Sequence, residues 1–388
     1  MIVSHSFKTV LTVLTINILS WYEFVIYIAL APIIATIFFP NLELQKSLFY
    51  TLLIASLTFI ARIAGGLFFG KMADNDSKRK SLMYSVVLMS VATLCIAILP
   101  TYKSIGYHWL YLITLPLIAI RLVQAFCIGG EFGSSIAFLM QIAPAKRVGL
   151  YGSIPMVGMG IGILLASITS IILNYFPAES VYSFGWRVSF LITGSLGVMS
   201  LYLRKGGKKN LTNQTKVAFS VKQYKKEIIS SIGIFSCSMF HLYLFCILIK
   251  AVMLSYNTQL PSVLYIANII TFVVFALVGG MLSQYRYAKQ IFIINIILLP
   301  IYSILIFTFY NTNFLILASL SVGILQGIIP KMLYDKLPKQ YLTTSLSLVN
   351  NLTAVIFGSI LVVVLQHFSM YGLVVMGFVL MVVTLLSV

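Results

Sequence analysis

The chain has 388 residues, of which 60% are hydrophobic and only 9% are charged. Soluble globular proteins are about 25% charged, and apolar runs of roughly 20 residues, each long enough to cross a ~30 Å hydrocarbon core, recur along this chain. The formal net charge of +18 does not indicate nucleic-acid binding, because the basic residues lie in short breaks between apolar runs. We therefore predict a polytopic membrane protein in a lipid bilayer.

Charge clusters and turn residues divide the sequence into twelve predicted membrane-spanning helices. The first is too long for the apolar core of a cleavable signal peptide, so we expect no such leader. The fourth is longer than a single crossing needs. In chain order the helices are 9–38, 48–70, 81–100, 109–141, 149–175, 187–203, 228–250, 261–283, 289–309, 313–334, 342–366 and 370–388.

Alternate breaks between these helices differ sharply in charge. One set of breaks is strongly basic. The other set holds only Lys46 and Lys103, with Arg187 and Lys250 at the edges of spans. Because Lys and Arg are retained on the cytoplasmic side of a membrane, we predict that both termini are cytoplasmic. The basic set, which holds 20 of the 26 Lys and Arg residues, comprises the N-terminus, 71–80, 142–148, 204–227, 284–289 and 331–341.

The longest basic break separates two sets of six helices. We predict an N-terminal bundle over 1–203, a basic cytoplasmic linker over 204–227 and a C-terminal bundle over 228–388. A weak internal repeat favours this division, since Gly70–Asp74 corresponds to Gly280–Gln284 at an offset of 210 residues. The expected fold class is all-α, with twelve transmembrane helices in two six-helix bundles.

Four segments of the first half carry recognisable motifs. They are NILSWYEFVIY from Asn17, GGLFFGKMADNDSKRK from Gly65, RLVQAFCIGGEFGSS from Arg121 and FGWRVSFLITGSLGVMSLYLRK from Phe184. Together they resemble motifs of the major facilitator superfamily of secondary transporters and, within it, of the metabolite:proton symporters that carry solutes such as proline and betaine. The resemblance covers about residues 15–205 and is thin beyond them.

The sequence departs from the family pattern at four positions. Ser20 replaces a glutamate before the tryptophan. Ser77 and Asn75 replace a glycine and a basic residue of the loop motif, and Gln284 replaces the matching acid of the second half. These departures leave open an alternative function: the protein could be a relic that no longer transports a solute and is kept as a membrane scaffold or sensor.

Charged residues inside the predicted spans each need a physical reason, because a charge at mid-bilayer costs roughly 2.5–3.5 kcal/mol on insertion scales. Glu23, Arg62, Arg121 and Glu131 lie well within spans of the first half. No acidic residue lies within the predicted spans of the second half. We therefore assign proton coupling to the first half.

Glu23 lies about 21 Å along the first predicted helix, where an apolar cavity would let a carboxyl group exchange a proton near neutral pH. A permanent ion pair with Arg62 or Arg121 is the alternative. Arg121 and Glu131 are ten residues and about 15 Å apart on one helix, so they cannot pair with each other. The resemblance implies that Arg121 takes part in proton transfer, and our hypothesis is that Glu131 or Glu23 carries the proton. For Arg62 a structural role is favoured over a role in transport.

Aromatic residues near the middle of the first helix are the predicted substrate contacts. Surface belts are the usual place for membrane aromatics, so their depth is informative. Trp21 or Tyr27, if facing a cavity, could hold a quaternary ammonium by cation–π attraction; packing against lipid is the alternative. Further polar candidates, which could instead bond to neighbouring helices, are Asn17, Gln124, Asn350 and Asn351.

The loop Gly70–Lys80 is the predicted gate. In the resembled family its acid, here Asp74, pairs with basic groups and with the N-terminus of a neighbouring helix, which closes one face of the transporter. Gln284 indicates that the counterpart in the second half is lost, so the predicted gate is one-sided. The residues assigned to it are Gly70, Asp74, Lys78, Arg79 and Lys80.

The resemblance implies a proton symporter of a bacterial inner membrane that imports a small metabolite by alternating access, with proline or betaine as the leading substrates. An organic acid such as 2-oxoglutarate or citrate is the alternative substrate class. We expect a monomeric functional unit and no enzyme activity, cofactor or metal, since the four cysteines have no metal-ligand spacing. The alternate glycines Gly158, Gly160 and Gly162 predict close helix packing.

Overall fold

The computed structural model describes residues 2–40, 42–101, 111–199, 223–255, 260–309 and 312–356. Throughout these ranges the regular secondary structure is helical, and no strand occurs in them. The prediction of an all-α protein is therefore confirmed. The last predicted helix, 370–388, and most of the predicted linker lie outside the described residues.

The helices of the first half follow the predicted spans closely, with two corrections. The helix predicted over 48–70 runs from Leu44 to Asn75, so Gly70 and Asp74 of the predicted gate loop lie within a helix. The predicted span 9–38 is two helices, because Pro32 has no N–H to bond to the carbonyl of Ile28, and the chain turns at Leu30. The long helices are α1 (Ile2–Ala29), α2 (Ala31–Phe38), α3 (Leu44–Asn75), α4 (Lys78–Ile98), α6 (Tyr111–Ile142), α7 (Val148–Leu173) and α9 (Trp186–Met199), with short turns η2 (Ala145–Arg147), α8 (Ala178–Ser180) and η3 (Val181–Gly185).

The second half continues in the same manner up to the start of the eleventh predicted span. Its helices are α10 (Lys225–Ser255), α11 (Leu260–Leu282), α12 (Ala288–Phe309), α13 (Thr312–Lys336), η5 (Lys339–Tyr341) and α14 (Leu342–Ala354). Within the described ranges, seven helices are long and apolar enough to cross a membrane.

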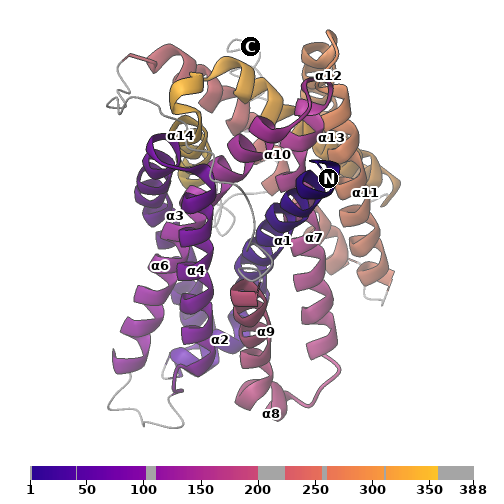
Figure 1. The fold of residues 1–388 in the computed structure, drawn as a ribbon. Coiled ribbons are helices and arrows are strands. Elements are labelled where there is room, and N and C mark those ends of the chain that lie inside the picture. The colour runs from indigo at the N-terminus through magenta and orange to yellow at the C-terminus, as the bar shows by residue number, and fades with distance from the viewer. Residues whose placement is uncertain are drawn as a thin grey trace.

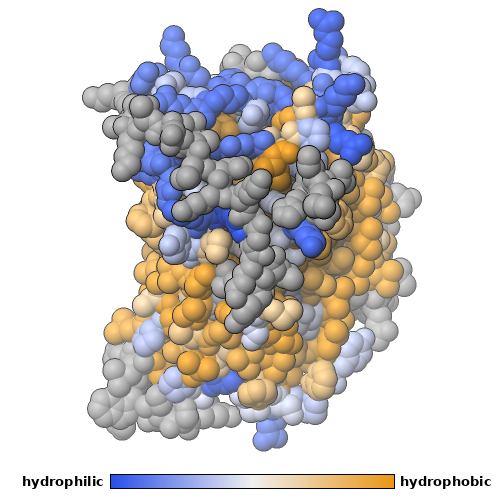
Figure 2. All heavy atoms as spheres, in the orientation of Figure 1, coloured by the Kyte–Doolittle hydropathy of each residue, from blue (hydrophilic) through white to orange (hydrophobic). Residues whose placement is uncertain are grey.

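The surface has the pattern of a membrane protein. On the face shown, a broad hydrophobic region covers the middle, and hydrophilic residues gather at the end where α14 begins (Figures 1 and 2). We call this the basic end, because it carries the turns Asn75–Lys80, Ala145–Arg147 and Ser283–Lys289. The opposite end carries α2 and α8 (Figure 1).

Glycines let α7 approach α1 closely. A Cβ on Gly162 would lie 2.6 Å from the carbonyl oxygen of Ile18, and one on Gly158 would lie 2.7 Å from Cβ of Asn17. Gly160 faces the other way, toward Phe272 of α11. The predicted close packing of these glycines is confirmed, and it serves both α1 and α11.

The two halves of the chain meet along two sets of helices. Helix α14 packs on α3 and α6, while α7 packs on α11 and α13. The largest cluster of buried apolar side chains crosses this boundary: Phe132 of α6 and Met156 of α7 belong to it together with Phe235 of α10 and Leu346 of α14. This boundary surrounds the candidate site.

Candidate functional site

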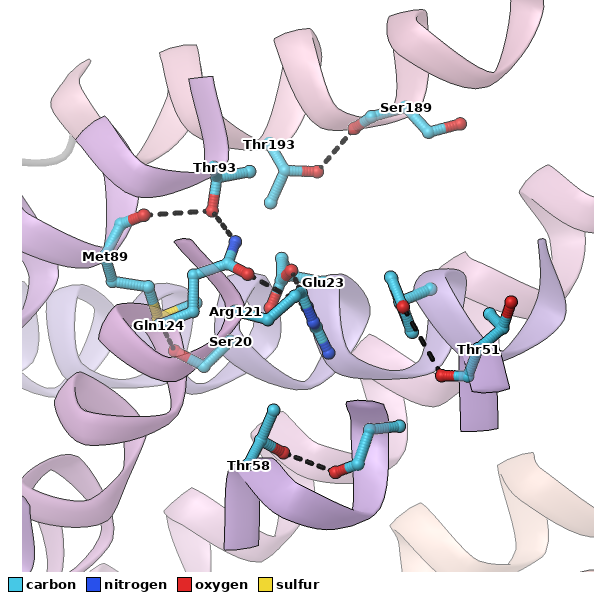
Figure 3. Close-up of polar contacts among 12 residues, drawn as sticks. Ser20, Glu23, Thr51, Thr58, Met89, Thr93, Arg121, Gln124, Ser189 and Thr193 are labelled. Carbon is cyan, nitrogen blue, oxygen red and sulfur yellow. Dashed lines mark hydrogen bonds and ion pairs between the residues drawn. The ribbon is translucent and has the colours of Figure 1, made fainter. Parts of the chain in front are cut away.

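Glu23 and Arg121 form a buried ion pair between α1 and α6 (Figure 3). Nη1 of Arg121 lies 2.5 Å from Oε1 of Glu23, and both side chains are almost completely excluded from solvent. The guanidinium also lies over the ring of Tyr27, 3.9 Å from its centroid. Of the two partners considered for Glu23, the structure shows Arg121.

Gln124 of α6 and Thr93 of α4 hold this pair in place. Nη1 of Arg121 donates to Oε1 of Gln124 at 2.9 Å, and Nε2 of Gln124 donates to Oγ1 of Thr93 at 2.9 Å. Thr93 commits its hydroxyl hydrogen to the carbonyl of Met89, so it can only accept from Gln124. The amide oxygen of Gln124 is thereby turned toward Arg121.

Glu131 has a different environment, although it lies on the same helix as Arg121. Its Oε2 accepts a hydrogen bond of 2.5 Å from Ser20 of α1, and the residue is only 3% exposed. Ser20 Oγ also lies 3.0 Å from the carbonyl oxygen of Ile16. A small cavity between α1, α4 and α9 adjoins Ser20 and is also lined by Met89 and Thr93. This hydroxyl stands where the family pattern has a carboxylate.

Arg62 is held by aromatic rings on α1 and α3. Its guanidinium carbon lies 4.7 Å from the ring centroid of Phe24 and 4.8 Å from that of Phe59. Trp21 packs edge-on against Phe24. Cation–π attraction of this kind stabilises a guanidinium that has left water.

Three of the predicted substrate contacts use their polar or aromatic groups within the first half in this conformation. Asn17 donates to the carbonyl of Val13 and to Oγ of Ser135 on α6. Gln124 bridges Thr93 and Arg121, and one face of the Tyr27 ring is covered by Arg121. Only Trp21 among the four predicted contacts remains partly exposed. The other three groups therefore have protein partners in this conformation, and their role as substrate contacts stays a prediction.

Asp74 closes the boundary between the halves at the basic end. It accepts hydrogen bonds from the backbone N–H groups of Thr343 and Thr344, at 3.1 and 2.8 Å, and from Oγ1 of Thr344 at 2.7 Å. Helix α14 has no side-chain cap of its own. Asp74, from the opposite half, therefore satisfies its free N–H groups and its positive helix end.

The approach of Asp74 depends on Gly70, one turn earlier in α3. A Cβ at Gly70 would lie 2.7 Å from Cα of Thr344, closer than real Cβ contacts come. Further along the same contact, Nδ2 of Asn351 donates to the carbonyl of Gly129 at 2.7 Å. Asn350, the other predicted polar candidate of α14, lies beside Asn351.

The basic residues of the predicted gate are arranged differently from the expectation. No ion pair joins Asp74 to Lys78 among the described residues; instead, Lys80 pairs with Asp76 at 2.9 Å on the exposed surface. Ser77 is the N-cap of α4, where its hydroxyl accepts from the backbone N–H of Lys80. This cap gives Ser77 a local function at a position where the family has glycine.

The second half has the corresponding helix contact without the acid. A Cβ on Gly149, at the start of α7, would lie 2.6 Å from the carbonyl oxygen of Gly280 and 3.1 Å from Cγ of Gln284. Gln284 is exposed and makes no hydrogen bond to α7 within the described residues. Helix α7 likewise has no side-chain cap of its own.

Sequence reasoning missed Thr93, Gln326 and Ser238. All three are buried polar residues within predicted spans, and Gln326 of α13 donates weakly to the carbonyl of Ser238 on α10. The sequence offered only their polarity as a signal, which many helix-packing residues share.

Comparison with known proteins identifies several relatives. The chain is 27% identical over 301 residues to the proline/betaine transporter of Salmonella typhimurium, covering 72% of this chain and 59% of that protein. It is 26% identical over 380 residues to a putative proline/betaine transporter of Staphylococcus aureus, covering 90% and 79%. Against the alpha-ketoglutarate permease of Escherichia coli the identity is 33% over 190 residues, covering 49% and 43%. The matched region thus spans about three fifths of the length of the Salmonella relative.

The fold has a close counterpart among solved structures. The proton:xylose symporter XylE bound to 6-bromo-6-deoxy-D-glucose superposes with a TM-score of 0.74 at 15% identity, covering 99% of this chain and 95% of that one. Residues 13–362 match the sequence pattern of the Major Facilitator Superfamily. The chain therefore belongs to the Major Facilitator Superfamily and is a multi-pass membrane protein.

Proposed function

We propose that this transporter is a proton symporter that imports a small zwitterionic metabolite such as proline or betaine by alternating access. The observation that carries the proposal is the pair of buried carboxyl groups in the first half, each with a different partner. Glu23 is neutralised by Arg121, whereas Glu131 is bonded to the neutral hydroxyl of Ser20. The similarity to proline/betaine transporters supports the substrate class.

Ser20 suits both protonation states of Glu131. When Glu131 is ionised, Ser20 donates its hydrogen to the carboxylate. When Glu131 is protonated, it can donate to Ser20, whose hydrogen then turns to the carbonyl of Ile16 at 3.0 Å. The carboxyl group therefore keeps a hydrogen bond in either state, which a cycling proton carrier requires in a dry site. We assign Glu131 as the carrier, and the pair of Arg121 and Glu23 as fixed charges about 15 Å away along α6.

The boundary between the halves supports alternating access. Thr343 and Ser347 of α14 are fully buried against Gly133 of the first half, and their hydroxyl oxygens have no hydrogen-bond partner among the described residues. Each such group carries a cost of burial. Water would satisfy them when the halves separate, so the closed state is not overwhelmingly stable. Within the proposal, Asp74 favours this closed state at the basic end.

Orientation and domain organisation complete the proposal. The basic end faces the cytoplasm, because Lys and Arg are retained there, and the membrane is the inner membrane of a bacterium. The halves 1–203 and 228–388 are the moving units, and 204–227 is the linker between them. The conformation seen here is then closed toward the cytoplasm.

An organic acid is the second candidate substrate. The 33% identity over 190 residues to the alpha-ketoglutarate permease favours this candidate. The non-transporting relic remains the alternative of a different class; the intact contact of Asp74 with α14 argues against it.

Counterflow in proteoliposomes tests the proposal. Vesicles loaded with unlabelled solute are diluted into labelled proline, betaine or 2-oxoglutarate, with protein-free vesicles as the control. We expect transient accumulation of labelled proline or betaine. Accumulation of 2-oxoglutarate alone supports the organic-acid alternative. If no solute accumulates, the result supports the alternative of a non-transporting relic.

A further inference from the structure

Gln326 and Ser238 form a buried polar pair in the second half, which has no acid at this depth. Gln326 is 0% exposed and Ser238 is 1% exposed. Oε1 of Gln326 and Oγ of Ser238 both lack a hydrogen-bond partner within the described ranges. Burying two oxygens without hydrogen bonds costs free energy, and a ligand that donates hydrogen bonds to them would remove this cost.

The pair lies at the same depth as Glu131. Gln326 is 10 residues from the end of α13 and Glu131 is 11 residues from the end of α6, which places each about 15–17 Å from the basic end of its helix. Ser238 lies 13 residues into α10, about 20 Å from its start. These depths place the pair and the carboxyl group in the middle of the membrane.

Neighbouring residues on the same helices contact the first half. Phe235, three residues before Ser238, contacts the ring of Phe132 next to Glu131, with centroids 5.7 Å apart. Pro330, one turn from Gln326 on α13, packs close to Gly152 of α7. Gln326 and Ser238 therefore lie at the boundary where the halves separate during transport.

The neighbours of Gln326 determine which way its amide points. Its weak 3.5 Å contact is with the carbonyl oxygen of Ser238, which can only accept. Nε2 must therefore face that carbonyl, and Oε1 must face away from it. The pair therefore presents two acceptors without a partner among the described residues: the amide oxygen of Gln326 and the hydroxyl oxygen of Ser238, whose hydrogen can also donate.

We propose that Gln326 and Ser238 bind the ammonium group of the substrate by accepting its N–H hydrogens, so that the transporter selects amino or imino acids over fully methylated ammonium compounds. This inference rests on the proposed function, since it concerns the same central pathway. An ammonium N–H donates a charge-assisted hydrogen bond to such acceptors. Betaine carries three methyl groups on its nitrogen and has no N–H to donate, whereas proline has two.

A series of methylated glycines isolates this contact. Sarcosine, dimethylglycine and betaine share the same carboxylate and differ in having two, one and no N–H groups. Each is tested as an inhibitor of labelled proline uptake into proteoliposomes. We expect Gln326→Leu to weaken the inhibition by sarcosine and by unlabelled proline about tenfold. Inhibition by dimethylglycine is expected to weaken less, and inhibition by betaine less than twofold, because only compounds with an N–H donor lose a bond to the amide. Ser238→Ala is expected to follow the same order.

Ser319→Ala is the matched control. Ser319 is buried on the same helix as Gln326, but its hydroxyl is bonded to Ile316 and Asn268. We expect it to leave the order of the series as in the wild type. An equal loss for every member in Gln326→Leu, or a larger loss for betaine than for sarcosine, overturns the assignment and leaves the proposed function intact. A wild type that takes up proline, yet whose uptake no member of the series inhibits, also overturns it. A wild type that transports neither proline nor betaine overturns the proposed substrate class, and this assignment with it.

Discussion

Glu23 and Arg121 show why buried charges in this protein must be judged as pairs. Each would be costly alone at mid-depth, but together they are neutral, and Tyr27 and Gln124 hold the guanidinium in place. A buried pair contributes little net stability, whereas breaking it leaves one charge uncompensated.

The ion pair gives a prediction for stability. Glu23→Gln, measured by thermal unfolding in detergent, is expected to lower the free energy of unfolding by about 3–5 kcal/mol, because Arg121 is left without its counter-charge. The double variant Glu23→Gln/Arg121→Gln is expected to be less destabilised than either single variant.

The exposed ion pair between Lys80 and Asp76 provides the control. Asp76→Asn is expected to leave the melting temperature unchanged, since exposed pairs contribute little. A double variant that shows the summed loss of both single variants would refute the pairing of Glu23 with Arg121.

At the scale of elements, the contact between α3 and α14 is an electrostatic cap supplied across the boundary. A carboxylate at a helix N-terminus accepts N–H groups that have no partner within the helix. Glycines make the approach possible, and small polar residues of α14 fill it. Such a contact can break and re-form without exposing a large apolar surface.

The first prediction at this scale concerns Asp74→Asn. An amide has no negative charge and presents only one acceptor oxygen, so it loses charge-assisted bonds worth about 1.5–3 kcal/mol. Labelling of a cysteine at Ser347 by a maleimide in detergent is expected to become about 10–100-fold faster in this variant, in a background that lacks the four native cysteines. Labelling at exposed Asn75→Cys is the control for reagent access. Equal rates at position 347 with and without the Asp74 carboxylate would show that Asp74 does not close the boundary.

The second prediction restores the acid missing from the second half. Gln284→Asp places a carboxylate near the start of α7, whose N–H groups have no side-chain cap. We expect slower labelling of the cysteine at position 347 and a higher melting temperature, because both caps then stabilise the closed state. Gln284→Asn, which has the same shape without the charge, should change neither. A faster rate in Gln284→Asp would contradict the twofold arrangement of the gate.

For the whole molecule, the membrane fold could be predicted from apolar runs and charge distribution. The observed helices begin and end near the predicted limits, with an error at Leu30, where Pro32 breaks a continuous apolar run. Glu23, Arg121 and Glu131 could be singled out because a charge in an apolar run is conspicuous. Their partners could not be predicted: Glu23 and Arg121 are 98 residues apart, and only helix packing brings them together.

The uncharged site residues were harder still to predict. A serine or threonine within a span commonly bonds to its own helix, as Ser90 does to Val86. Nothing in the sequence separates Ser90 from Ser238, whose hydroxyl has no partner among the described residues. The distinction depends on which helix face meets the other half.

Orientation in the membrane gives a prediction for the whole molecule. Asn75 lies at the basic end and Glu179 at the opposite end, and both are exposed. In intact cells, a membrane-impermeant maleimide is expected to label Glu179→Cys and to leave Asn75→Cys unlabelled until the membrane is permeabilised. The reverse pattern would invert the proposed orientation.

The central claim is that Glu131 carries the coupling proton. In proteoliposomes with an imposed pH gradient, the wild type is expected to concentrate labelled proline or betaine above equilibrium. Glu131→Gln should lose this accumulation and keep counterflow, which needs no net proton movement. Glu43→Gln, which neutralises an exposed acid, is the control and should behave as the wild type. Accumulation that persists in Glu131→Gln at the wild-type level would contradict the account.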